Sequence, residues 1–152
     1  MQWTPDRNGG FSRADFAQLY LPPLMDPVYG FAAVNVEAEQ RNTSSFLHWM
    51  RKLLAVRRQF PILGTGQLEI VPSANPSVLG YIRSAREESE MVNPVLCVHN
   101  LSRLAQPAEL HVERWAGRQP IELLGRVAFP LVGDGPYPVT LGPYGSHCFE
   151  LA

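Results

Sequence analysis

One loop near the start of the sequence, within MQWTPDRNGGFS, carries side chains that could bind a sugar. Gln2, Trp3, Asp6, Asn8 and Phe11 provide a planar amide, two aromatic rings and several hydrogen-bonding groups. Side chains of these kinds stack on the faces of sugar rings and bond to sugar hydroxyls. We therefore predict these five residues as candidates for substrate binding.

The sequence carries no motif that would assign a catalytic residue. It lacks GxxxxGK[ST], GxGxxG, HExxH, CxxC and GxSxG, so phosphate loops, zinc sites and the common nucleophile elbows have no support. A pair of carboxylates could act as acid and base, but the flanking residues select no pair among the acids of the first forty positions. These acids are Asp6, Asp15, Asp26, Glu37 and Glu39. We predict no catalytic residue, no metal site and no cofactor.

The histidines and the acidic run are interpreted as structural or solvated. His48 lies on a predicted helix, and the others lie in or beside separate predicted strands, at His99, His111 and His147. Glu87, Glu88 and Glu90 would repel one another in a site, so we expect a solvated turn there.

Composition and charge restrict the class of protein further. The 152 residues are 45% hydrophobic, which is enough for a buried core, and the formal net charge is -1. That charge gives no general attraction to nucleic acid or to an anionic membrane. Because no apolar run approaches the roughly 20 residues of a membrane span and no secretion signal is present, we expect a cytoplasmic protein. Cys97 and Cys148 have no disulfide or metal spacing, so we expect buried free thiols.

A single long amphipathic helix is predicted over residues 42–60, and we expect the rest of the chain to be built against it. Apolar residues recur there at three- and four-residue spacing, which gathers them on one face. They are Phe46, Trp49, Met50, Leu53, Leu54, Val56 and Phe60. Asn42 or Thr43 is the expected N-terminal cap.

The segment before this helix, residues 1–41, is predicted to be irregular because Pro and Gly interrupt every regular period. Its many apolar residues are unusual for a solvated linker and indicate that it covers a surface. After the helix, short runs of period two predict strands at 67–71, 78–83, 95–100, 108–112, 120–124, 138–141 and 146–151. Seven short strands separated by turns favour an antiparallel β-sandwich or Greek-key barrel with the helix outside it.

The sequence resembles the α-amylase superfamily over nearly its whole length. MQWTPDRNGGFS resembles the segment that follows the last barrel strand in the branch of trehalose synthases and oligo-1,6-glucosidases. The residues from YGFAAVNVEAEQ to GTGQLEIV resemble the end of the long loop and the final helix of the barrel. VLCVHNLSRLAQPAELHVERWAGRQPIELLG resembles the C-terminal domain of the trehalose synthases, also called maltose α-D-glucosyltransferases. The closing Gly-Ser-His-Cys-Phe departs from the more aromatic ending of that family.

This resemblance implies a division of the chain at residue 61. Residues 1–61 would be the last loop and helix of a (β/α)8 catalytic barrel, and residues 62–152 a C-terminal all-β domain. The parent would be an isomerase that interconverts maltose and trehalose by intramolecular glucosyl transfer. Such a retaining mechanism needs two carboxyl groups about 5 Å apart, and in the family these lie on strands that precede Met1. We therefore expect the chain alone to be inactive and structural.

The resemblance also implies partners and leaves alternatives open. The expected partners are the catalytic barrel of the same protein and a second copy or a maltose kinase, with maltose and trehalose bound only by the intact parent. One alternative is a carbohydrate-binding β-sandwich module with Trp115, Tyr137 and Tyr144 along one surface. Another is the C-terminal part of an oligo-1,6-glucosidase or of another α-amylase-like glycoside hydrolase.

Overall fold

The computed structural model describes residues 2–86 and 92–152, so the predicted acidic turn at Glu87, Glu88 and Glu90 lies outside the described residues. The chain divides into two compact units, Met1–Leu54 and Ala55–Ala152.

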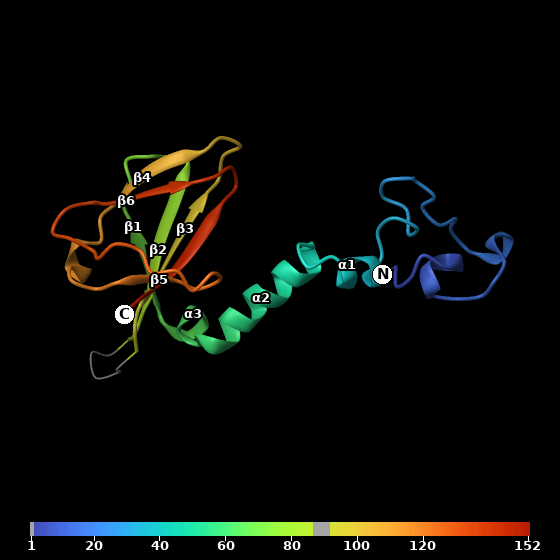
Figure 1. Ribbon diagram of the computed structural model, residues 1–152, viewed down its shortest axis with the longest axis horizontal. Helices are drawn as coiled ribbons and strands as arrows, with labels where there is room; N and C mark the ends of the chain where they lie inside the picture. Colours follow the sequence, from blue (N-terminus) through green and yellow to red (C-terminus); the bar gives the residue numbers. More distant parts are fainter. Residues whose placement is uncertain (1, 87–91) are drawn as a thin grey trace. The chain divides into compact units, whose positions relative to one another are not determined.

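The second unit contains an antiparallel β-sandwich of two sheets (Figure 1). The larger sheet has the strand order β1-β2-β3-β7-β5, and β4 pairs with β6 in the smaller one. The strands are β1 Gln67–Val71, β2 Val78–Ser84, β3 Val95–Asn100, β4 Gln106–Leu110, β5 Pro120–Glu122, β6 Tyr137–Leu141 and β7 Ser146–Leu151. The predicted mainly β fold with an antiparallel sandwich is confirmed. The last strand, β7, lies between β3 and β5, and such a non-sequential strand order is typical of Greek keys.

Six of the strands lie close to their predicted positions, but β4 begins and ends two residues before the predicted range 108–112. The strand extends back through Pro107, which an edge strand tolerates because its missing amide faces no partner. It ends at Leu110 because Val112 leaves the extended region, with φ -124° and ψ 21°, and begins the short 3-10 helix η3, Glu113–Trp115.

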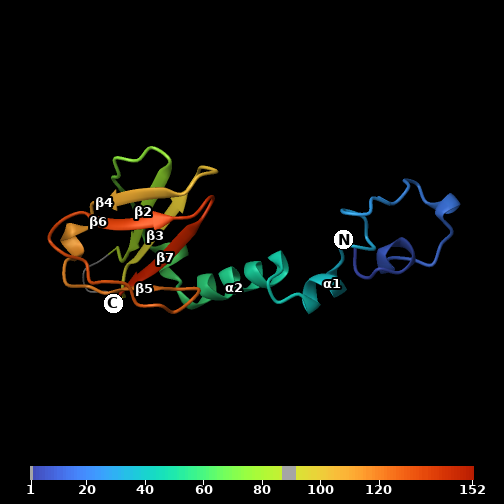
Figure 2. The same ribbon diagram turned by 45° about the horizontal axis from the view of Figure 1, so that its top comes forward.

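The main core lies between the two sheets, where β4 and β6 lie over one face of the larger sheet (Figure 2). Strand alternation sends every second side chain inward, as in β6, where Tyr137, Val139 and Leu141 are buried and the residues between them are exposed. Phe149 of β7 is fully buried and contacts the edge of the Phe129 ring at a centroid distance of 4.9 Å. This interior is the largest apolar cluster of the sandwich.

A smaller core lies on the opposite face of the larger sheet. It consists of Ile62, Val95, Cys97 and Leu123, with Val56, Phe60, Leu63, Tyr81 and Cys148 packed around it. The helical residues come from the end of α2, Phe46–Gln59, and from the short helix α3, Ile62–Thr65. The α3 helix was missed because its four residues are too few to show a period.

The long helix is shorter than predicted and does not organise the chain. It begins at Phe46 rather than Asn42, because Asn42 ends an unpredicted helix, α1, Val36–Arg41. Ser45, rather than Asn42 or Thr43, stands before its first turn and accepts from the amide of His48 at 3.4 Å. None of the residues of α2 is buried. The expectation that the chain is built against this helix is therefore wrong.

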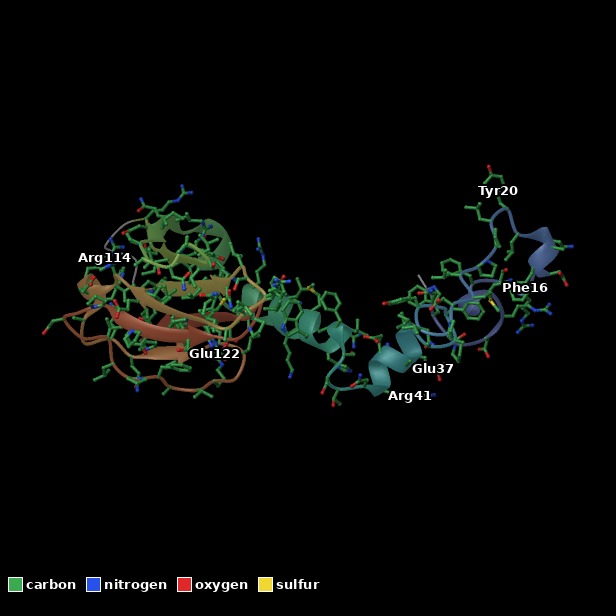
Figure 3. The ribbon with its side chains drawn as sticks, turned by 90° about the horizontal axis from the view of Figure 1, so that it is seen from above. Phe16, Tyr20, Glu37, Arg41, Arg114 and Glu122 are labelled. Carbon is green, nitrogen blue, oxygen red and sulfur yellow. The ribbon has the colours of Figure 1, made fainter. Side chains whose placement is uncertain are left out.

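The first unit is an irregular segment with two short 3-10 helices, η1 Arg7–Gly10 and η2 Phe16–Gln18, followed by α1 and the first part of α2. Its surface is unusually apolar. Tyr20 is 98% exposed and points away from its loop (Figure 3), and Leu21 is 72% exposed. Further exposed apolar residues in this unit are Phe11, Leu24, Met25, Val28, Tyr29, Phe46 and Leu54.

Candidate functional site

The predicted sugar-binding loop is a tight structure based on three consecutive residues with positive φ. Asn8, Gly9 and Gly10 have φ of 56°, 64° and 78°, in the left-handed region that glycine and asparagine tolerate best. This turn directs the carbonyl of Gly9 back along the chain, where it accepts from the amides of Trp3 at 2.7 Å and Thr4 at 3.2 Å. The Asn-Gly-Gly sequence thus determines the backbone beside Trp3.

Asn8 holds the following segment onto the turn. Its Nδ2 donates to Ser12 Oγ at 3.0 Å and to the carbonyl of Ala14 at 2.9 Å. Its Oδ1 is buried and accepts no hydrogen bond from the described residues. The side chain of Asn8 is therefore engaged within the protein, and its donor group is not available to a sugar.

The other side of the loop is bonded to the start of α1. The amide of Val36 donates to the carbonyl of Gln2 at 2.9 Å, and the amide of Glu37 donates to the carbonyl of Trp3 at 3.0 Å. Asn35 caps this helix, since its Oδ1 accepts from the amide of Ala38 at 2.8 Å. The backbone of Gln2 and Trp3 is thus held from two directions, which sequence reasoning missed because α1 was not predicted.

The five predicted residues lie in one loop, but they differ in availability. Asp6 accepts a hydrogen bond from the hydroxyl of Thr4 at 3.0 Å, and Asn8 is engaged as described. The ring of Trp3 is 48% exposed and that of Phe11 is 66% exposed, while Gln2 is half-buried. The arrangement offers aromatic surface on a rigid backbone, the kind of feature on which a sugar ring stacks.

The acids of the first unit mostly stabilise local backbone. Asp15 Oδ1 accepts from the amide of Ala17 at 3.1 Å. Asp26 Oδ1 accepts from the amides two and three residues further on, at 2.7 Å and 2.8 Å. Glu37 forms an ion pair with Arg41 one turn along α1 (Figure 3). These carboxylates are therefore occupied separately, and no two of the three are brought together as an acid and base.

The four histidines make local contacts. His48 Nε2 lies 3.0 Å from the carbonyl of Gln40, and His111 Nδ1 lies 3.0 Å from Glu113 Oε1. His99 stacks on Tyr81 at a centroid distance of 5.6 Å, and burial lowers its pKa. His147 packs against aromatic rings of the sandwich core.

The aromatic residues expected of a carbohydrate-binding module do not share an exposed surface. Tyr137 is only 5% exposed, and its hydroxyl donates to the carbonyl of Pro130 at 2.9 Å. Trp115 packs against the main core, with the guanidinium of Arg114 4.8 Å from its ring. Tyr144 alone of the three is largely exposed, at 72%.

Within residues 2–86 and 92–152, no three or more His, Cys, Asp or Glu side chains are grouped so that they could hold a metal ion. Over the same residues, no helix has both the length and the apolar character needed to cross a bilayer.

The loop, helix and seven-stranded sandwich together define the class of all-β C-terminal domains found in α-amylase-like enzymes. Residues 68–147 match the family described as Maltogenic Amylase, C-terminal domain, and the chain belongs to this family. The predicted similarity to trehalose synthases is also confirmed. The chain is 48% identical over 151 residues to trehalose synthase/amylase TreS of Mycobacterium tuberculosis strain H37Rv, an alignment that covers 99% of this chain and 25% of that protein.

Two further relatives place this similarity in context. The probable oligo-1,6-glucosidase 2 of Bacillus subtilis strain 168 is 27% identical over 103 residues, which are 68% of this chain and 16% of that protein. The solved structure of trehalulose synthase MutB from Pseudomonas mesoacidophila MX-45 has the same fold, with a TM-score of 0.70 and 22% identity over 99% of this chain and 24% of that one. The chain thus spans about a quarter of the length of the trehalose synthase that it matches.

Proposed function

We propose that this chain supplies the C-terminal, non-catalytic part of a trehalose synthase, whose intact form interconverts maltose and trehalose by moving a glucosyl unit within one active site. The observation that carries the proposal is the 48% identity over 151 residues to a mycobacterial trehalose synthase/amylase. The lower identity to a probable oligo-1,6-glucosidase, 27%, makes the oligo-1,6-glucosidase alternative the weaker one.

The role of the chain in this proposal is structural, with the reacting carboxylates supplied by the remainder of the enzyme. Residues 1–61 would complete the catalytic barrel, and residues 62–152 would form the C-terminal domain. The surface of the first unit supports this role, because its exposed aromatic and aliphatic side chains, such as Tyr20 and Leu21, are of the kind that another protein surface covers. We further propose that the protein acts in the cytoplasm, as a homo-oligomer or in association with a maltose kinase.

The loop of Gln2 and Trp3 is the part of this chain that we propose to contribute to the wall of the substrate site. Its support is the doubly bonded backbone, which fixes the direction of the side chains, and the half-exposed ring of Trp3. Asp6, Asn8 and Phe11 would shape the same loop. Maltose and trehalose would contact this wall only in the intact enzyme.

An activity measurement tests the proposal directly. The purified 152-residue chain is incubated with maltose and, separately, with trehalose, and a heat-killed sample serves as the control. We expect no interconversion and no release of glucose above that control. Formation of either disaccharide from the other by the chain alone would overturn the structural role.

A binding measurement separates this role from that of a carbohydrate-binding module. Calorimetric titration of the chain with maltose, trehalose and a soluble glucan is expected to give no saturable heat. Saturable binding of the glucan that is lost on the substitution Tyr144→Ser, in the most exposed of the three sandwich aromatics, would favour the binding module instead.

A further inference from the structure

Cys97 of β3 and Cys148 of β7 lie directly opposite each other in the larger sheet. Both are free thiols, as predicted from the sequence. Cys97 is 1% exposed, whereas Cys148 is only partly buried. The two strands are separated by about fifty residues of chain, so this juxtaposition is created by the fold alone.

The hydrogen-bond pattern of the two strands places this pair at a site where the side chains approach closely. The amide of Leu151 donates to the carbonyl of Pro94 at 2.9 Å, and the amide of Asn100 donates to the carbonyl of Gly145 at 2.9 Å. The pairs Pro94–Leu151 and Asn100–Gly145 are therefore hydrogen-bonded pairs. Hydrogen-bonded and non-hydrogen-bonded pairs alternate along an antiparallel ladder, so Cys97 and Cys148 form a non-hydrogen-bonded pair.

Non-hydrogen-bonded pairs have Cα atoms about 4.5 Å apart. That separation lies at the short end of the range of roughly 4.4–6.8 Å that disulfides span. The register therefore allows a disulfide without a slip of either strand.

The surroundings favour reaction within the pair over reaction with outside thiols. Cys97 belongs to the smaller core with Val95 and Leu123, and Phe60 packs against the same cluster. Hydrogen bonding by the Cys148 thiol lowers the pKa of Cys97, burial opposes that effect, and the Tyr81 hydroxyl lowers the pKa further. Burial and the neighbouring Cys97 raise the pKa of Tyr81 to about 12, so its hydroxyl remains a donor.

We propose that Cys97 and Cys148 form a reversible disulfide within one chain when the protein meets hydrogen peroxide. The hydrogen bond to Cys97 and burial raise the pKa of Cys148, so Cys97 is the sulfur with the lower pKa. Because the thiolate is the nucleophile, the sulfur of Cys97 attacks one peroxide oxygen. The O–O bond breaks, and the departing hydroxide takes the thiol proton to give water and a sulfenic acid.

The sulfur of Cys148 then attacks the sulfur of Cys97. The S–O bond breaks, and the hydroxide that leaves takes the remaining thiol proton as a second water. Peroxide is reduced to two waters while two thiols are oxidised to one disulfide. Small thiols reverse the reaction by thiol–disulfide exchange. In a reducing compartment the resting state is then the dithiol, and the disulfide forms only under oxidant.

Intact-mass analysis of the full chain tests this proposal. The reduced protein is treated with hydrogen peroxide and denatured in an excess of an alkylating reagent. We expect the intact mass to fall by two hydrogens, with neither cysteine alkylated. After digestion without reductant, we expect one crosslinked peptide that joins residues 97 and 148. A phosphine reductant should restore both alkylation sites. Alkylation of both cysteines after peroxide treatment, or crosslinks found only between chains, would overturn the proposal.

Two single variants provide the matched controls. In Cys148→Ser, peroxide should leave Cys97 as a sulfenic acid that a 1,3-dicarbonyl reagent traps after denaturation, with no crosslink. In Cys97→Ser, Cys148, whose pKa is raised, should stay largely unmodified on the same time scale. Faster modification of Cys148 than of Cys97 would contradict the proposed order of attack. The wild-type measurement needs neither variant to fold, and none of these readouts depends on sugar turnover or on the proposed function.

Discussion

The amide of Trp3 donates to the carbonyl of Gly9 at 2.7 Å, across a turn in which Asn8, Gly9 and Gly10 all have positive φ. This bond closes the loop that carries the candidate sugar-binding residues. A Cβ at Gly9 would lie 3.4 Å from Gln2 Cα and 3.5 Å from Phe31 Cβ, which are ordinary van der Waals contacts, so the position is restricted mainly by its positive φ.

Substitution of Gly9 by alanine should therefore loosen this loop. An alanine at φ 64° costs about 1–2 kcal/mol, and we expect the amide of Trp3 to exchange with solvent roughly tenfold faster or more. Hydrogen exchange measured by NMR checks this. Gly117→Ala is the matched control, since that residue has φ 85° but no atom within 4 Å of the added Cβ. Unchanged exchange of Trp3 in Gly9→Ala would contradict the role of the turn.

Asn100 connects the end of β3 to two loops of the sandwich. Its Nδ2 donates to the carbonyls of Leu104 at 2.7 Å and Gly142 at 2.8 Å, and its Oδ1 accepts from the amide of Ser102 at 2.9 Å. Asn100→Ala removes these three hydrogen bonds, although the carbonyls of Leu104 and Gly142 keep Ser102 Oγ and the amide of Gly145 as donors. The loss should lower the free energy of unfolding by about 1–3 kcal/mol. Urea denaturation followed by the β-sheet signal measures this loss. Leu101→Ala, at a neighbouring residue that is 63% exposed, should have a much smaller effect.

His99 should make the sandwich less stable in acid. Burial lowers its pKa in the folded state, so below its ordinary value of about 6.5 the unfolded chain binds more protons than the folded one. Stability is therefore fully present above that value and is lost as the pH falls toward the lower pKa of the folded state.

We expect the melting temperature to fall between about pH 7 and pH 5, and we expect this slope to be smaller in His99→Phe, which keeps a ring against Tyr81. Calorimetry at several pH values checks the difference. His48→Gln, which lies in the other unit, should keep the slope of the parent, and an equal slope in His99→Phe would contradict the assignment.

The exposed apolar side chains of the first unit should cause self-association. Tyr20 and Leu21 are 98% and 72% exposed, and water-exposed surface of this kind drives contacts between copies. The double substitution Tyr20→Ser and Leu21→Ser should lower the mean mass seen by light scattering at a fixed concentration.

The control for that measurement is Tyr144→Ser, which removes from the sandwich a ring of a residue that is 72% exposed. It should change the association much less. A parent chain that stays monomeric from dilute to concentrated solution would contradict the prediction.

Local patterns made the strands predictable, whereas contacts distant in sequence made the helical segments hard to predict. The strands at 67–71, 95–100 and 146–151 were correct to the residue, because alternating or continuous apolar runs end there at turn-forming residues. The α1 helix was missed because its six residues are too few for a period, and its start depends on Asn35 and on bonds to the loop of Gln2 and Trp3. The apolar spacing correctly predicts that α2 is amphipathic. The spacing does not show whether the surface that would cover the apolar face belongs to the same chain.

The sequence by itself determined the all-β class, the positive φ of the Asn-Gly-Gly turn and the family resemblance, because each follows from residue types at fixed local spacing. Only the tertiary structure shows that the side chain of Asn8 donates its hydrogen bonds within its own loop, whereas Trp3 stays half-exposed. It alone placed Cys97 opposite Cys148. The register between β3 and β7 is set by burying Leu96, Val98 and Phe149 on one face of the sheet, and no local pattern encodes which residue of one strand meets which of the other.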